Sequence, residues 1–132
     1  MRELAGIFRA LADETRLQMM GMLLRRREIC VCDFVEVLGV TQSKASRHLR
    51  YLLHAGLVAD RRAGLWVHYR LADEFGPDAR LIVRDLRAVL GGDRLRNLHA
   101  RLARSLKLKA AAGGVCAMAP QRRRAERKGG AR

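Results

Sequence analysis

The N-terminal part of the chain repeats apolar residues at the spacing of amphipathic helices. Leu4, Ile7, Phe8 and Leu11 follow the i, i+3, i+4, i+7 pattern, which predicts a helix from Leu4 to Leu11. Asp13 belongs to the residue types that cap helix N-termini, so a second helix is expected to begin directly after it. The residues that this second helix would turn inward are Leu17, Met20, Leu23 and Leu24.

Two more helices are predicted on either side of a single glycine. Cys32 to Leu38 fits a short helix that ends at Gly39, and Thr41 can cap a longer helix from Gln42 to His54. Gly56 follows the longer helix at the place where a left-handed C′ residue is common. The apolar stripe of the longer helix is Ala45, Leu49, Leu52 and Leu53.

After these four helices the period of the pattern changes to that of strands. Leu57–Arg62 and Leu65–Leu71 are typical of two short strands around Ala63-Gly64, which predicts a β-hairpin. Pro77 fits the first position of the next helix. The apolar positions of that helix are Leu81, Ile82, Leu86, Val89 and Leu90.

The C-terminal part divides into a helical segment and a polar tail. Gly91-Gly92 interrupts the helical pattern, and Asp93 is a candidate cap for a restart. From Ala110 onward the chain is rich in Ala and Gly and then in Arg, which is typical of a segment that is disordered or ordered only by a partner. We therefore predict a folded unit over residues 1–109 and a flexible basic tail over residues 110–132. The leucines that continue at helical spacing are Leu95, Leu98, Leu102 and Leu106.

The order of the predicted elements indicates a fold class that is mainly α with a small β-hairpin, in the order α-α-α-α-β-β-α. A helix, a turn at Gly39, a second helix and then a basic hairpin make a winged helix-turn-helix. In such a motif the second helix enters the major groove of DNA by its N-terminal turns. One winged helix reads only half of a typical site, so we expect a homodimer. The first helix and the region Leu81–Leu106 offer apolar surface for that dimer, for the monomer's own core, or for both.

The charge of the chain agrees with a DNA-binding fold. Its 27 Lys and Arg residues exceed its 13 Asp and Glu residues, for a formal net charge of +14. Such a balance favours nucleic acid or another anionic surface as the partner, and solubility alone is the alternative explanation. A non-specific nucleoid protein is a rival interpretation, which salt-dependent binding without operator preference would support.

The longer helix offers polar side chains that are suited to reading bases. Gln can pair with adenine and Arg with guanine, while Ser can contact a base or a phosphate. The hairpin arginines can reach a minor groove or the DNA backbone. A solvated charged face is the alternative for the basic members. The candidate DNA-contacting residues are Gln42, Ser43, Lys44, Ser46, Arg47, His48, Arg61 and Arg62.

The cysteines and the apolar runs bear on location and on function class. Three cysteines, two of them at Cys30 and Cys32, do not form a disulfide framework. No signal peptide and no apolar run long enough for a bilayer are recognisable, so we expect a cytoplasmic protein with reduced thiols and no membrane partner. The sequence has no phosphate loop and no convincing Ser/His/Asp set, which argues against an enzyme.

Three stretches of the chain resemble the ArsR/SmtB family of metal-responsive repressors. They are FRALADETRLQMMGML, EICVCDFVEVLGVTQSKASRHLRYLLHAGLV and the RRAGLWVHYRL hairpin, so the likeness runs from about Leu4 to Leu90. The box Glu28–Phe34 is similar to the Glu-Leu-Cys-Val-Cys-Asp-Leu box of arsenic-responsive members, although Glu14 stands where the family usually has proline. The resemblance implies a dimeric repressor that releases its operator when As(III) or Sb(III) binds Cys30 and Cys32.

The cysteine set departs from that of the best-known arsenite sensors, which carry a third cysteine where this chain has Val35. Trivalent arsenic prefers three soft ligands, so Cys116 is a candidate third ligand from the same or the other subunit. A cellular thiol can instead fill the third place, or the inducer can be a methylated or aryl arsenical that needs only two thiolates. A free thiol with no ligand role is an equal alternative for Cys116.

A divalent metal is a less favoured ligand. Zinc sites need about four ligands. The related zinc sensors use Asp and His pairs on the C-terminal helix, but here Arg87 follows Asp85 where a His would be needed and His99 stands alone.

The spacing of Cys30 and Cys32 suggests how a bound ligand would act. In a regular helix residues i and i+2 point about 200° apart, whereas in an extended chain they share a face. An ion that bridges both thiols is therefore expected to distort the start of the short helix and to bias the recognition helix away from DNA. A redox or persulfide signal at the same thiols, beside the basic run Arg25–Arg27, is the rival interpretation.

Overall fold

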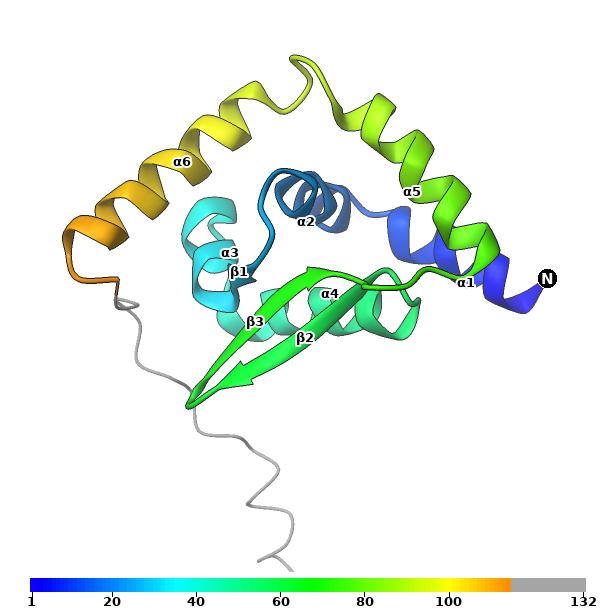
Figure 1. The fold of residues 1–132 in the computed structure, drawn as a ribbon, viewed down its shortest axis with the longest axis horizontal. Helices are drawn as coiled ribbons and strands as arrows, with labels where there is room; N and C mark the ends of the chain where they lie inside the picture. Colours follow the sequence, from blue (N-terminus) through cyan, green and yellow to red (C-terminus); the bar gives the residue numbers. More distant parts are fainter. Residues whose placement is uncertain (115–132) are drawn as a thin grey trace, which may run out of the picture.

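The computed structural model describes residues 1–114, and in this part of the chain six helices combine with a three-stranded sheet (Figure 1). Helix α1 spans Arg2–Leu11 and α2 spans Glu14–Arg25. The predicted cap of α2 is confirmed, because the Asp13 carboxylate accepts a hydrogen bond from the backbone N–H of Arg16 at 3.0 Å. The Asp13 cap of α2 and the apolar periodicity of both helices are local signals, which is why both helices could be predicted.

Helix α2 forms the centre of the core. It contacts α4, α5, α6 and strand β3, so more than one of its faces is covered. Met19 and Met22 are therefore fully buried, although the apolar pattern singled out only Met20 and its leucine neighbours. Unbranched methionine side chains suit such a position, since they fill irregular gaps between several packed elements.

The helix-turn-helix consists of α3 (Val31–Leu38) and α4 (Gln42–His54). Gly39 ends α3 in the left-handed region at φ +66°, and the Thr41 hydroxyl accepts the N–H of Lys44 at 3.2 Å to cap α4. Phe34 of α3 and Leu49 of α4 are fully buried between the two helices and the rest of the core. The predicted motif, with both of its caps, is confirmed.

The hairpin, which is the wing of the motif, pairs β2 (Val58–Ala63) with β3 (Trp66–Leu71) in antiparallel fashion. Ala63 lies opposite Trp66, so the turn is Gly64-Leu65 and begins one residue later than the sequence predicted. Gly64 has φ +61° and occupies the first of the two turn positions, where a type II′ hairpin requires glycine. Leu65 is left at the tip of the wing with 77% of its surface exposed.

A short third strand, β1 (Ile29–Cys30), was not predicted from the sequence. It pairs with β3, with Ile29 opposite Tyr69 and Cys30 opposite His68, and gives the sheet order β1-β3-β2. Two residues are too few to show an alternating pattern. The strand places one cysteine of the conspicuous pair in the same sheet as the wing.

The glycine pair interrupts the C-terminal helical pattern as expected, leaving α5 (Pro77–Leu90) and α6 (Arg96–Ala111). The prediction that Asp93 caps the restart is wrong, because Leu95 is the N-cap residue and makes no side-chain capping bond. Asp93 instead pairs with the Arg96 guanidinium, and Leu95 packs against Gly21 of α2. From this corner α6 runs alongside α3, while α5 lies next to α1 (Figure 1).

Candidate thiol site and nucleic-acid interface

Two thiols converge at the junction of β1 and α3. Cys30 is the N-cap residue of α3, with an extended backbone at φ −71° and ψ 146°, and Cys32 lies in the first turn of the helix. Their Sγ atoms are 3.0 Å apart, and both residues are buried. Two bonds of about 2.3 Å to one thiophilic atom would hold the sulfurs about 3.3–3.8 Å apart, so bridging requires only a small separation of the pair.

This geometry corrects one expectation from the sequence. A ligand that bridges the two thiols was expected to require a distorted helix start, because i and i+2 diverge within a helix. The structure shows that Cys30 lies outside the helix in extended backbone, so the helical divergence does not apply to the pair. Unwinding of α3 is therefore not needed for bridging, and any coupling to DNA must use another route.

A buried ion pair borders the thiols. Asp33 is 5% exposed, and its Oδ2 atom accepts a hydrogen bond from Lys109 Nζ of α6 at 3.2 Å. The same Nζ atom lies 3.8 Å from Cys32 Sγ. Sequence reasoning assigned no site role to either residue, since Asp33 stood out only as a member of the box Glu28–Phe34 and Lys109 is 76 residues further along the chain.

The surroundings of Cys30 keep its thiol protonated in the absence of a ligand. Burial raises the pKa of the Cys30 thiol, while a hydrogen bond from the backbone N–H of Cys32 and the charge of Lys109 act in the opposite direction. Ligation by thiolates must therefore release protons. One oxygen of Asp33 and the two Sγ atoms lie within 4.8 Å of one another, whereas Cys116 lies outside the described residues.

The exposed face of α4 carries part of the predicted DNA-contacting set. Ser43, Lys44 and Arg47 are exposed, and Ser46 is half-buried beside them. Gln42 is also half-buried, and its Oε1 atom is buried without a hydrogen-bond partner in residues 1–114. A rotation of the Gln42 side chain that brings this oxygen to a hydrogen-bond donor would therefore be favourable.

His48 does not lie on that exposed face. Its side chain is 15% exposed, and its Nδ1 atom accepts a hydrogen bond from the Arg16 guanidinium at 3.0 Å. Arg16 also donates to the carbonyl oxygens of Ala10 and Arg9 and stacks over the ring of Tyr51. Burial is the largest cause that lowers the pKa of His48, so the imidazole is neutral. The structure thus places His48 in the joint of α1, α2 and α4, in contrast to its predicted role as a base reader.

The two predicted wing arginines differ in their surroundings. Arg61 forms a two-pronged ion pair with Glu28, with Nε and Nη2 at 3.1 Å and 2.5 Å from the carboxylate oxygens. This guanidinium lowers the pKa of the Glu28 carboxyl. Arg62 is exposed and forms no ion pair within the described part of the chain. Arg62 is therefore available to a DNA phosphate directly, and Arg61 only in competition with Glu28.

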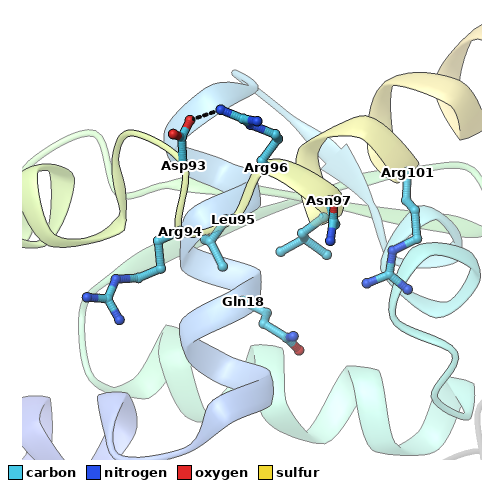
Figure 2. Close-up of a pocket in the computed structure, with 8 residues that line it drawn as sticks. Gln18, Asp93, Arg94, Leu95, Arg96, Asn97 and Arg101 are labelled. Atoms are coloured by element: carbon cyan, nitrogen blue, oxygen red, sulfur yellow. Dashed lines mark ion pairs between the residues drawn. The ribbon is translucent and has the colours of Figure 1, made fainter.

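A polar surface pocket of about 380 Å³ lies apart from both places, where the start of α6 meets α2 (Figure 2). Gln18, Asn97 and Arg101 contribute to its lining, and the ion pair of Asp93 and Arg96 lies beside it. Neither Cys30 nor Cys32 lines this pocket. In residues 1–114 there is also no helix with the length and apolar character that a membrane crossing requires.

The comparisons with known proteins agree with this architecture. Residues 13–60 match the family described as bacterial regulatory protein, arsR family. The arsenical resistance operon repressor of Bacillus subtilis is 46% identical over 74 residues, which are 56% of this chain and 70% of that protein. The chain belongs to the ArsR family. The family resemblance that the thiol box and the helix-turn-helix suggested is thereby confirmed, as is the expectation of a regulatory protein rather than an enzyme.

Two further relatives of this ArsR-family chain are informative. The arsenical resistance operon repressor of Escherichia coli is 50% identical over 66 residues, which are 50% of this chain but only 56% of that protein. The match thus spans little more than half of that relative. A homodimeric winged helix-turn-helix DNA-binding domain from Mycobacterium bovis has a TM-score of 0.56 and 31% identity, covering 67% of this chain and 78% of that one. The winged helix-turn-helix fold is therefore confirmed.

Proposed function

We propose that this chain is a cytoplasmic, dimeric repressor that binds operator DNA through α4 and the wing and is released by a trivalent metalloid at Cys30 and Cys32. The observation that carries this proposal is the pair of buried thiols 3.0 Å apart at the start of α3. Soft thiolates are the ligands that arsenic and antimony prefer. Relatives that are named as arsenical resistance repressors support the same reading.

The position of the thiols provides the coupling that a sensor needs. Cys30 belongs to β1, which pairs with β3 of the wing, and Cys32 belongs to α3, which packs on α4. A ligand that displaces both sulfurs therefore acts on both elements that would contact DNA. Since binding free energies are reciprocal, operator DNA must weaken the metalloid affinity by the same factor.

Cys116 is our candidate for the third thiolate. The described chain ends at Gly114, whose N–H donates to the carbonyl of Lys109 at 2.7 Å, and the ammonium of Lys109 lies at the thiol site. Cys116 follows Gly114 by only two residues in the sequence. A cellular thiol, or an organic arsenical that needs two thiolates, is the alternative to this third ligand.

The dimer is proposed to form through α1 and α5. These helices lie next to each other and expose Phe8 (56%), Leu81 (51%) and Val89 (56%). Apolar side chains of this size on adjacent helices are typical of a surface that pairs about a twofold axis.

The test is release of the reduced protein from its own promoter DNA, followed by fluorescence anisotropy with arsenite or phenylarsine oxide. Release by arsenite in the wild type, and its loss in Cys116→Ser, would make Cys116 the third ligand. Release by phenylarsine oxide in both proteins, with arsenite weak in both, would leave a two-thiolate site for organic arsenicals. No release by either compound would contradict metalloid sensing.

A redox sensor is the second candidate, because the short distance between the sulfurs also suits oxidation. A peroxide that removes two electrons and two protons from the thiols would join them as a disulfide. Release by peroxide without release by arsenite would support this candidate over the metalloid sensor.

A further inference from the structure

A lysine ammonium borders the proposed thiol site and brings a positive charge to it. Lys109 Nζ lies 3.8 Å from Cys32 Sγ and 3.2 Å from Asp33 Oδ2. The Lys109 and Asp33 side chains are 22% and 7% exposed. At such positions a charge is screened far less by water and salt than on an open surface.

We propose that Lys109 is a specificity-determining residue, which makes the thiol site select uncharged trivalent metalloid hydroxides over divalent thiophilic cations. The inference rests on the proposed function, since it concerns the ligand of the same site. It assigns to α6 a role that the cysteine box alone does not reveal.

Charge is the first reason for this selectivity. A divalent cation that displaces the thiol protons of Cys30 and Cys32 forms a neutral unit with the two thiolates, so it still needs further donors, and the Asp33 carboxylate is the one beside it. Arsenite at neutral pH is the uncharged hydroxide As(OH)₃. Each As–S bond that it forms replaces one hydroxide, which leaves with the thiol proton as water, so the bound metalloid is neutral without the carboxylate.

The second reason is the donor count. Cys30, Cys32 and Asp33 place two sulfurs and one carboxylate oxygen within 4.8 Å of one another, which is a usable set for a divalent ion completed by water. Lys109 occupies the carboxylate through its ion pair. The lysine therefore withholds the oxygen ligand that a cation needs and that a thiophilic metalloid does not.

The experiment compares Cd²⁺ and arsenite binding to the reduced, full-length protein without DNA. Calorimetry and the ultraviolet absorption of metal–thiolate bonds would be measured for wild type, Lys109→Met, Lys109→Arg and the control Lys107→Met. Lys107 is exposed on the same helix. We expect Lys109→Met to tighten Cd²⁺ binding by at least about tenfold and to leave arsenite affinity within about threefold. Lys109→Arg and Lys107→Met should behave as the wild type.

A double variant serves as a control for destabilisation, because Lys109→Met leaves the buried Asp33 carboxylate without its ion-pair partner. Asp33→Asn with Lys109→Met removes one charge of each sign and the carboxylate ligand together. Its Cd²⁺ affinity should return to within about threefold of the wild type. Circular dichroism would verify that every variant is folded.

Equal Cd²⁺ affinity in the wild type and Lys109→Met would overturn the inference, as would a Lys109→Arg protein that binds Cd²⁺ like Lys109→Met. If the wild type binds arsenite but its Cd²⁺ affinity equals that of Lys109→Met, only the role of Lys109 is refuted. Absence of arsenite binding in the wild type would refute the proposed function and this inference with it.

Discussion

Arg47 and His48 are neighbours in α4 with opposite surroundings, and this difference separates recognition from positioning. Arg47 is exposed on the face that would meet DNA, whereas His48 bonds to Arg16 inside the joint of α1, α2 and α4. A polar residue type in a recognition helix is thus not enough to assign base contact. The direction of each side chain around the helix decides it.

We expect Arg47→Ala and His48→Ala to have contrasting effects. Arg47→Ala should lower operator affinity by about tenfold or more, and should change the free energy of unfolding by no more than about 0.5 kcal/mol. His48→Ala removes a partly buried hydrogen bond and should cost about 1 kcal/mol of stability. Urea unfolding and anisotropy would measure both quantities. A His48→Ala protein of unchanged stability that loses operator preference would restore His48 as a base reader.

At the scale of elements, sequence reasoning predicted the features that local interactions define and missed those that depend on residues far apart in the chain. Helices α2 and α4 were predictable, because Asp13 and Thr41 cap them within three residues. Strand β1 was not, since its two residues are defined only by pairing with β3 about forty residues away. The ion pair of Asp33 and Lys109 is equally non-local. The cysteines of the box Glu28–Phe34 could therefore be recognised in the sequence, but the ion pair beside them could not.

The wing is tied to the segment before β1 by the ion pair of Arg61 and Glu28. The Glu28 carboxylate partly neutralises a guanidinium that would otherwise attract phosphate. Glu28→Gln should therefore raise DNA affinity about threefold at low salt and steepen the salt dependence by about 0.9 in log–log slope, as for one added phosphate contact. The double variant with Arg61→Ala should lose this gain in an anisotropy titration at several salt concentrations. A gain that persists in the double variant would show that Arg61 does not contact DNA.

At the scale of the whole molecule, one short segment links the candidate sensor to both DNA-contacting elements. Residues 29–38 contain β1 and α3, which contribute the thiols, pair with the wing and pack on α4. Helix α6 covers the outer side of this segment and contributes Lys109 (Figure 1). A second subunit is not needed to complete the pair of thiols, so the proposed dimer would serve DNA recognition first. In this proposal the net charge of +14 attracts DNA, and two recognition helices provide the specificity.

The proposed dimer surface on α1 and α5 can be tested by placing a charge on it. Phe8→Glu or Leu81→Glu places a charge on the exposed apolar face of α1 or α5. Because these side chains are more than half exposed in the monomer, the fold should persist while the dimer dissociates. Sedimentation velocity should show monomers, and operator affinity should fall by at least about a hundredfold, since one half-site contact is lost. Leu108→Glu, on the exposed side of α6, is the matched control and should remain dimeric. If Leu108→Glu dissociates and Phe8→Glu does not, the subunits pair through α6, and metalloid binding beneath α6 would then act on the dimer itself.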